Sequence, residues 1–288
     1  MGFEITYYDP VTNTRRIKAE TEPISYSNKV EFYAYLDNLE PNRTYYYRAY
    51  TYDGLNYNYG DPCSFKIEKN ADGPMPTDGL VAYYPFNGNA NDESGNGNHG
   101  SVRGNVVLTS DRFGNANSAY RFPGQPFNYI SVPDDETLHC STFTLNAWVY
   151  TDADNYGSGY LINKGRDINN GSYRLLVRNV GATNLYGGSN DAYIDDYPEK
   201  GVWHMVTGTV EGKTARYYLD GVLMDERTLS YPFVFNNSDP LTLGMHYYSG
   251  VPSYWAYPLL GIMDDVRIYN RVLSPSEIKT LYHEPNGQ

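Results

Sequence analysis

Short alternating segments separated by turn residues fill most of this chain, and they constrain its fold more than any other feature. From Gly79 onward, apolar and aromatic runs alternate with Gly, Asn and Asp turns over about two hundred residues. A two-residue turn, Asp220-Gly221, lies between Tyr217-Tyr218-Leu219 and Val222-Leu223-Met224 and predicts a β-hairpin. Regular short strands of this kind are typical of a sandwich or a jelly roll. We therefore predict an all-β protein.

A helix is predicted only near the end of the chain. Ser274-Pro275-Ser276-Glu277 has proline at a first-turn position and the Ser/Glu spacing of a capping box. It is followed by Ile278 and Leu281, which continue a short helix. One terminal helix beside many strands leaves the all-β prediction unchanged.

The composition favours strands and disfavours two kinds of partner. The 288 residues include 32 tyrosines, whose ring fits a half-buried pleated surface while the hydroxyl still reaches water. A net charge of −12 and the lack of any Lys/Arg cluster disfavour a nucleic acid. The sequence also lacks an apolar run of about 18 residues that could insert into a membrane. We expect neither a nucleic acid partner nor membrane insertion.

The strand pattern divides the chain into two regions. Residues 1–68 form a first β region, with strands predicted over 2–8, 15–19, 30–36, 44–52 and 64–68. Residues 69–77 form a linker rich in Gly, Pro and polar residues, and residues 78–288 form a second β region. Cys63 and Cys140 fall in different regions, which argues against a disulfide framework.

One segment of the first region carries a family resemblance. Leu39-Glu40-Pro41-Asn42-Arg43-Thr44-Tyr45-Tyr46-Tyr47-Arg48-Ala49-Tyr50 resembles a stretch of fibronectin type III modules from surface proteins of gut Bacteroidetes. The resemblance implies that Tyr45 or Tyr47 closes a corner by bonding the backbone. Such modules have about seven strands, so the five predicted here indicate a partial module.

Four stretches of the second region carry a separate resemblance. They cover residues 79–100, 143–149, 201–222 and 261–274. In sequence and in order they resemble the concanavalin A-like, laminin-G-like (LamG_3, pentraxin-like) jelly roll over nearly all of residues 78–283. The resemblance implies a two-sheet sandwich that binds a ligand rather than catalysing a reaction. The motifs specify the fold, and none of them specifies the ligand.

Strand alternation gives the closing strand a chemical signal. It places Asp264 on one face with Val266 and Ile268, and Asp265 on the other face with Arg267 and Tyr269. An aspartate among apolar neighbours is costly unless it is paired or bound to a metal.

A calcium ion is one partner that the resemblance implies for this aspartate. In related jelly rolls, calcium joins the N-terminal loop to an aspartate of the last strand. Carried over, a structural Ca²⁺ is expected on Asp92, on oxygens of Gly95 to Asn98, and on Asp264, with Asp265 as the alternative ligand. The competing interpretation is that Asp92 and Asn98 form turns and that Asp264 bonds loop amides.

A long aromatic segment, residues 246–258, is the second chemical signal. Tyrosine and tryptophan rings stack on sugar rings, and neighbouring polar groups bond the hydroxyls. The expected carbohydrate-binding residues are Tyr247, Tyr248, Tyr254, Trp255, Tyr257 and, from the polar segment 186–197, Asp191. Alternatively, these aromatic residues cover a hydrophobic edge or pack against the first region.

Patterns typical of an enzyme are absent from the sequence. It has no E-x-D-x-x-E strand of the kind that glucanases of this fold use, no G-x-S-x-G elbow and no phosphate loop. The acidic runs Asp134-Asp135-Glu136 and Asp195-Asp196 are contiguous and lie in turn-like sequence, so their carboxylates are expected to point apart. We expect His204, beside Trp203, to pack rather than to catalyse.

These signals together predict a non-catalytic, lectin-like carbohydrate-binding module that binds a polysaccharide or the glycan of a glycoprotein. The chain opens directly in a strand without a signal peptide, so we expect it to be part of a larger multidomain protein. The expected location is extracellular, on the cell surface or in the periplasm of a bacterium. The alternatives are a protein-binding adhesion or structural module and a glycoside hydrolase whose carboxylates come from separate strands.

Overall fold

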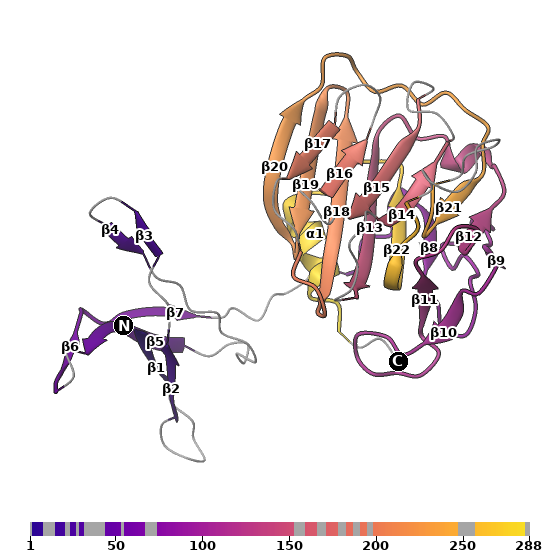
Figure 1. Ribbon diagram of the computed structural model, residues 1–288. Coiled ribbons are helices and arrows are strands. Elements are labelled where there is room, and N and C mark those ends of the chain that lie inside the picture. Colours follow the sequence, from indigo (N-terminus) through magenta and orange to yellow (C-terminus); the bar gives the residue numbers. More distant parts are fainter. Residues whose placement is uncertain are drawn as a thin grey trace. The chain divides into compact units, whose positions relative to one another are not determined.

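The chain forms two compact units, Met1–Asp72 and Gly73–Gln288, in the computed structural model (Figure 1). The division falls within the linker expected at residues 69–77. Every strand pairing that the structure describes is antiparallel. The described residues are 2–7, 15–20, 24–26, 29–31, 44–52, 55–66, 74–152, 159–165, 171–177, 183–186, 191–194, 198–246 and 257–285.

The first unit contains a five-stranded sheet and a separate hairpin. The sheet has the order β2-β1-β5-β6, and β7 also pairs with β5. Tyr45 is buried, and its ring stacks on Phe65 with centroids 5.5 Å apart, whereas Tyr47 is only half-buried. The bounds are β1 (Gly2–Tyr7), β2 (Arg15–Glu20), β3 (Ile24–Tyr26), β4 (Lys29–Glu31), β5 (Thr44–Tyr52), β6 (Tyr57–Tyr59) and β7 (Cys63–Lys66). The fibronectin-like assignment of this unit stays a prediction.

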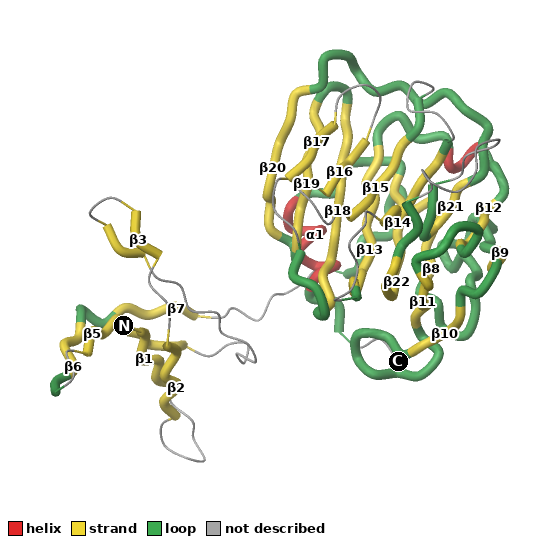
Figure 2. Tube along the Cα trace, viewed as in Figure 1, coloured by secondary structure: helices red, strands yellow, loops and turns green. Residues whose placement is uncertain are grey.

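The second unit is a sandwich of two antiparallel sheets, which Figure 2 shows as layers of strands joined by loops. One sheet has eight strands in the order β10-β11-β22-β13-β18-β19-β20, with β8 as a further partner of β22. Its strands are β8 (Leu80–Tyr84), β10 (Val107–Thr109), β11 (Ala119–Pro123), β13 (Phe143–Thr151), β18 (Trp203–Glu211), β19 (Thr214–Leu219), β20 (Val222–Thr228) and β22 (Leu260–Tyr269). The all-β sandwich prediction is confirmed.

The other sheet of the sandwich has seven strands in the order β17-β16-β15-β14-β21-β12-β9. Its strands are β9 (Ser101–Arg103), β12 (Tyr129–Val132), β14 (Gly159–Lys164), β15 (Tyr173–Val177), β16 (Thr183–Tyr186), β17 (Asp191–Ile194) and β21 (Leu241–Leu243). A short 3-10 helix, η1 (Glu136–Leu138), precedes β13.

The main hydrophobic core lies between these two sheets. Phe122, Phe143 and Met263 from the eight-stranded sheet pack there with Ile130 and Leu243 from the seven-stranded sheet, and all five are fully buried. Burying such side chains contributes about 1.5–3 kcal/mol each. The residues that alternate with them along each strand therefore point to the outer faces of the sandwich.

A second, smaller core joins the terminal helix α1 (Pro275–Tyr282) to the outer face of the eight-stranded sheet (Figure 1). Ile278 and Leu281 pack there with Trp148 and Tyr269, and the ring of Tyr282 stacks on Trp148 at 5.6 Å. The predicted capping box is confirmed, because Ser274 and Glu277 bond each other's backbone N–H groups. The predicted hairpin is confirmed as well, with positive φ at both Asp220 (51°) and Gly221 (77°).

The closing strand β22 has an interruption that positions the site described below. One edge of β22 pairs with β13, and the other edge pairs with β11 at Leu260 to Met263 and with β8 at Val266 to Tyr269. Pro85 follows β8 directly and has no N–H with which to continue the ladder. Asp264 and Asp265 therefore lie in the gap between two neighbouring strands.

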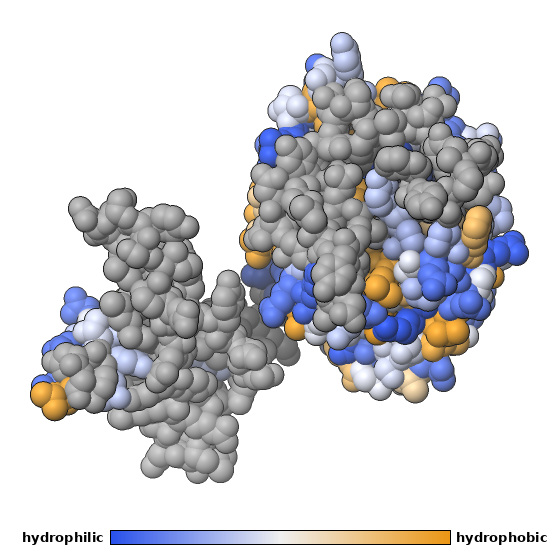
Figure 3. Space-filling model, in the orientation of Figure 1, coloured by the Kyte–Doolittle hydropathy of each residue, from blue (hydrophilic) through white to orange (hydrophobic). Residues whose placement is uncertain are grey.

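The surface of the second unit is mixed in character. On the face drawn in Figure 3, hydrophobic patches are separate and lie among hydrophilic residues. Large apolar side chains with high exposure include Phe127 (69%), Tyr231 (76%) and Val222 (62%). Among the described residues, no helix is long and apolar enough to cross a membrane.

Candidate functional site

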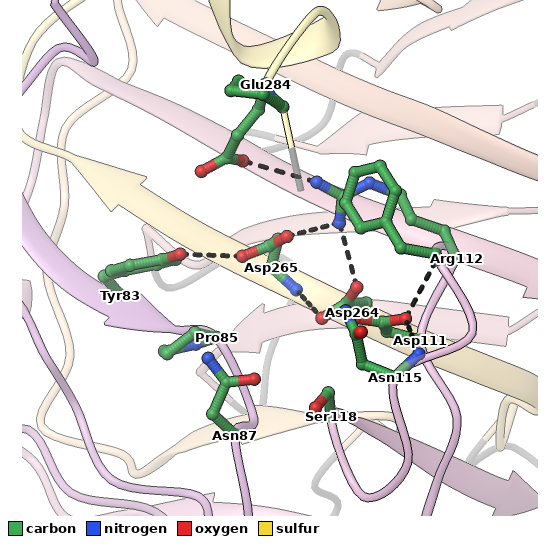
Figure 4. A pocket seen from close by; sticks show the side chains of 12 residues that line it. Tyr83, Pro85, Asn87, Asp111, Arg112, Asn115, Ser118, Asp264, Asp265 and Glu284 are labelled. Atoms are coloured by element: carbon green, nitrogen blue, oxygen red, sulfur yellow. Dashed lines mark hydrogen bonds and ion pairs between the residues drawn. The ribbon is translucent and has the colours of Figure 1, made fainter. Parts of the chain in front are cut away.

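A polar pocket opens at the gap in the edge of β22. It has a volume of about 350 Å³, part of which is open to solvent. Four parts of the second unit meet here: the segment after β8, the loop between β10 and β11, the middle of β22, and the residues that follow α1 (Figure 4). The lining residues are Tyr83, Pro85, Asn87, Asp111, Arg112, Phe113, Asn115, Ser118, Asp264, Asp265, Glu284 and Pro285.

A β-bulge brings both aspartates of β22 into this pocket. Asp265 has a φ of 45°, and β22 holds one more residue than β13 between the pairs Asn146–Arg267 and Trp148–Asp264. Met263, Val266 and Ile268 all belong to the core between the sheets, whereas Asp264 and Asp265 both contact Arg112. The expectation that Asp264 shares a face with Val266 and Ile268 is therefore wrong, because the bulge breaks the strict alternation.

Arg112 is the centre of the pocket's ion-pair network. Its Nη1 donates to Asp264 Oδ2 at 2.9 Å and to Asp265 Oδ2, and its Nη2 lies 3.5 Å from Glu284 Oε2. The guanidinium also lies over the rings of Phe113 and Trp148, with centroids at 4.4 and 4.6 Å. One buried arginine therefore joins β22 to the segment after α1.

A second arginine, Arg267, completes the ion-pair network. Arg267 Nη2 donates to Glu284 Oε1 at 2.6 Å, and its guanidinium lies 4.1 Å from the ring centroid of Tyr83. The hydroxyl of Tyr83 donates to Asp265 Oδ1 at 2.8 Å. Two guanidinium groups thus face three carboxyl groups, so a single retained proton would balance their charges.

Burial and the neighbouring Asp265 raise the pKa of Asp264 to about 8, although Arg112 acts in the opposite direction. Burial also raises the pKa of Glu284 above its usual value. Burial lowers the pKa of Arg267, but Asp265, Tyr83 and Glu284 together outweigh it and raise that pKa. Asp264 and Glu284 therefore both retain a proton more readily than a solvent-exposed carboxyl group does.

The loop that presents Arg112 is held by Asp111, the residue before it. Asp111 Oδ1 accepts hydrogen bonds from the backbone N–H groups of Phe113 (2.9 Å) and Asn115 (2.8 Å), and its Oδ2 accepts one from Asn115 Nδ2. Gly114 adopts the positive φ (88°) that this turn requires. The turn therefore holds the backbone around Arg112 through bonds within the loop, independently of the contacts with β22.

The residues present do not fit a calcium ion shared by Asp92 and Asp264. Asp92 Oδ1 accepts from the backbone N–H groups of Tyr83 and Ser94, and Oδ2 accepts from Ser94 Oγ and the Asn98 N–H, all at 2.9 Å. These four bonds use the whole acceptor capacity of the carboxylate. Asp264 accepts from Arg112 and from the Asp265 N–H.

The other expected ligands serve the turn instead. Asn98 Nδ2 donates to the carbonyl of Val81 and to Thr137 Oγ1, both at 2.9 Å, and Gly95 has a positive φ of 93° in the same loop. Among the residues that the structure describes, no group of three or more His, Cys, Asp or Glu could hold a metal ion. The geometry of this loop agrees with the competing interpretation, in which Asp92 and Asn98 form a turn.

The carboxyl pair of the pocket also differs from that of a glycoside hydrolase. In retaining enzymes, two carboxyl groups about 5–5.5 Å apart flank the glycosidic bond. Here Asp264 and Asp265 bond the same nitrogen of Arg112, so the guanidinium occupies the space between them. The arrangement suits charge compensation rather than proton transfer to a sugar.

Of the expected carbohydrate-binding residues, the structure describes only Tyr257 and the backbone of Asp191, which lies in the seven-stranded sheet. Tyr247, Tyr248, Tyr254 and Trp255 lie outside the described residues. Asp191 is the first residue of β17, at one edge of that sheet. Tyr257 is half-buried, and its ring lies 6.0 Å from that of Tyr160 on β14.

A polar and aromatic cluster lies on the outer face of this sheet, beneath the ends of the aromatic segment. His246 and Tyr257 flank the undescribed residues of that segment. Both contact the ring of Tyr160, with His246 stacked at 5.1 Å. Arg174 Nη1 donates to Tyr160 Oη at 3.3 Å. Arg174 alternates with the core residues Tyr173 and Leu175, so its side chain points to the outer face of the sheet.

Sequence reasoning missed several charged residues that the fold brings together. Arg112, Arg267 and Glu284 come from distant segments, and only the Asp-Arg-Phe-Gly turn signal around Arg112 is visible locally. Lys164 is fully buried and bonds Asp134 and the carbonyl of Asp239. His204 bonds Asp220 at 2.8 Å beside the hairpin turn.

The comparison that assigns a family rests on the second unit. The family model described as the concanavalin A-like lectin/glucanases superfamily (Laminin_G_3) matches residues 123–279, which is more than half of the chain. The chain belongs to this family. In this Laminin_G_3 domain, the matched residues run from the end of β11 into α1 and so include β22 with Asp264 and Asp265. No curated protein matches the sequence.

Solved structures share the fold of this Laminin_G_3 domain. Domain 4 of AbnA, an extracellular GH43 arabinanase from Geobacillus stearothermophilus solved in complex with arabinotriose, superposes with a TM-score of 0.58 at 23% identity. The match covers 71% of this chain and 98% of the arabinanase domain. The binding domain of Paraclostridial Mosquitocidal Protein 1 (TM-score 0.56, 19% identity) covers 72% of this chain and 52% of its own. The receptor-binding domain of botulinum neurotoxin D superposes with a TM-score of 0.55 at 18% identity. The match covers 72% of this chain and 52% of the toxin domain.

Proposed function

We propose that the second unit is a non-catalytic, lectin-like carbohydrate-binding module of an exported or cell-surface bacterial protein. The family includes lectins, and one structural neighbour was solved with arabinotriose. The proposal assigns the contact with the glycan to the aromatic segment 246–258, whose two ends meet at the seven-stranded sheet.

The observation that carries this proposal is the attachment of the aromatic segment to that sheet. The Leu259 N–H donates to the Gly244 carbonyl at 2.9 Å, so the chain leaves and rejoins the sandwich at one point. Just inside this closure, His246 and Tyr257 rest on Tyr160. A segment that stacks sugar rings needs a fixed base of this kind.

The middle of the seven-stranded sheet carries polar side chains that are covered from solvent. Arg174 on β15, Asn163 on β14 and Thr242 on β21 belong to neighbouring strands, and each is at most 2% exposed. Asn163 Nδ2 lies 3.4 Å from Thr242 Oγ1, so these polar side chains form one continuous row. Asp191 on β17 would extend the row toward the edge of the sheet.

Binding to polysaccharides tests the proposal directly. The intact chain is expected to bind at least one polysaccharide on a glycan array or in an affinity gel, with arabinan among the ligands tried. Trp255→Ala and Tyr254→Ala are expected to weaken binding about tenfold or more, because one sugar–aromatic stack contributes roughly 1–2 kcal/mol.

Phe127→Ala is the matched control, because Phe127 is an exposed aromatic residue (69%) that lies outside segment 246–258. The proposal fails if no glycan is retained, or if the Phe127 variant loses as much affinity as the Trp255 variant. Binding that survives enzymatic removal of the partner's glycans would instead favour the protein-binding alternative, for which the toxin receptor-binding neighbours are precedents. Release of reducing sugar would favour a hydrolase.

A further inference from the structure

The guanidinium of Arg112 lies where a structural cation would be held. One oxygen from each of three carboxyl groups faces it: Asp264 Oδ2, Asp265 Oδ2 and Glu284 Oε2. The three acids come from β22 and from the segment after α1, whereas Arg112 comes from the loop between β10 and β11. The arginine therefore joins separate parts of the sandwich through their carboxylates, as a bound divalent ion does.

Its surroundings hold this positive charge in a buried position. The Arg112 side chain is only 6% exposed, and it lies between the rings of Phe113 and Trp148. Like charges within a few ångströms repel strongly where water is excluded. A metal ion on the same three oxygens would therefore have to displace the guanidinium.

The oxygens left over are already used in other ways. Asp264 Oδ1 accepts from the Asp265 N–H, Asp265 Oδ1 accepts from Tyr83 Oη, and Glu284 Oε1 accepts from Arg267. These bonds fix the direction of each carboxyl group independently of Arg112. Removal of the guanidinium would thus leave three buried carboxyl oxygens without their cationic partner, which destabilises the fold.

We infer that Arg112 takes the structural role that a calcium ion was expected to take, so that this module is fastened without a metal. The inference concerns the fastening of the fold and does not depend on the glycan proposal.

Thermal unfolding with and without calcium tests this inference on the intact chain. The melting temperature of the wild type is expected to be the same in EDTA and in millimolar calcium. Arg112→Ala is expected to lower it in EDTA by on the order of 10 °C, because a buried charge network loses its partner. Calcium is expected to recover none of that loss, because no group of three or more His, Cys, Asp or Glu among the described residues could hold a metal ion.

Terbium luminescence provides a second readout, with excitation through Trp148, whose ring lies beside Arg112. Saturable terbium binding at this position is not expected in the wild type, because the guanidinium already occupies it. Arg112→Lys keeps the charge, so it is expected to fold and to remain insensitive to calcium. Arg216→Ala is the matched control, because it removes an arginine of the same sheet that pairs with the exposed Glu226.

Three results would overturn the inference. A wild type destabilised by EDTA would show that a metal fastens the module after all. Equal melting temperatures for Arg112→Ala and the wild type would deny the arginine a structural role. Terbium that binds saturably beside Trp148 in the wild type would show that a metal ion, and not the arginine alone, is held there. If Arg112→Ala does not fold, the EDTA result on the wild type and the Arg112→Lys protein decide.

Discussion

Gly244 lies at the base of the aromatic segment, where a side chain has no room. Its φ is +88°, and a Cβ at this position would overlap the ring of Phe122, which is fully buried in the core. Its N–H donates to the Leu161 carbonyl, and its own carbonyl accepts from Leu259. Glycine is therefore required here both for its backbone conformation and for the close approach of Phe122.

Gly244→Ala is expected to lower the free energy of unfolding by about 3 kcal/mol, from the strained φ together with the overpacked ring. Gly88→Ala is the matched control, because Gly88 has a similar φ (+83°) and nothing within 4 Å of its Cβ position. It is expected to lose about 1 kcal/mol, from strain alone. Urea unfolding followed by fluorescence measures both. Equal losses would show that contact with Phe122 does not matter.

The residues of the pocket show how far single positions could be read from the sequence. Asp264 was singled out correctly as a residue that needs a partner, since a buried carboxylate is costly wherever it lies. That partner, Arg112, could not be found, because it lies about 150 residues away and no local pattern links the two. The same holds for Lys164 and Asp134, which are 30 residues apart in sequence.

Among the elements, those defined by short-range patterns were predicted well. The hairpin at Asp220-Gly221 and the capped helix α1 depend on residues at most four apart, so the sequence contains all the information that they need. The bulge in β22 depends on which strands pair on either side of it, and strict alternation therefore misplaced Asp264. The ends of the aromatic segment meet through tertiary contacts with Tyr160, which the sequence does not show.

Helix α1 offers a test at low pH. The hydrogen bond from Arg271 to Glu277 lowers the pKa of this carboxyl from 4.5 to about 2, although partial burial opposes it. A lowered pKa stabilises the fold above pH 4.5, and the stabilisation disappears as the pH falls toward 2. Glu277→Gln keeps the cap but loses the charge, so it is expected to cost about 0.5 kcal/mol at neutral pH, since solvent screens this exposed pair.

The difference between the wild type and Glu277→Gln is therefore expected to shrink as the solution is acidified from pH 4.5 to about 2, as measured by urea unfolding at each pH. Glu93→Gln, at an exposed glutamate outside the helix, is expected to show no such trend. A difference that stays constant over this range would mean that the ionised form of Glu277 does not stabilise α1.

At the scale of the whole molecule, both cores of the second unit are built from its own residues. All the side chains of the two clusters come from position 75 onward. Residues 73–288 alone are therefore expected to unfold in one cooperative thermal transition, measured by circular dichroism. A chain starting at residue 93 is the control. It lacks β8, which supplies the buried Val81, Ala82 and Tyr84, and it is expected not to fold. Cooperative melting of that shorter chain would show that β8 is dispensable.

The interrupted edge of β22 also has a consequence for biosynthesis. This strand follows every other described strand of the second unit, yet it lies in the interior of its sheet and joins β8, β11 and β13. A nascent polypeptide leaving the ribosome therefore carries β8 unpaired for about 180 residues before its partner emerges. Until then the apolar faces of the earlier strands stay available to chaperones and to aggregation, and maturation of the sandwich awaits the synthesis of β22.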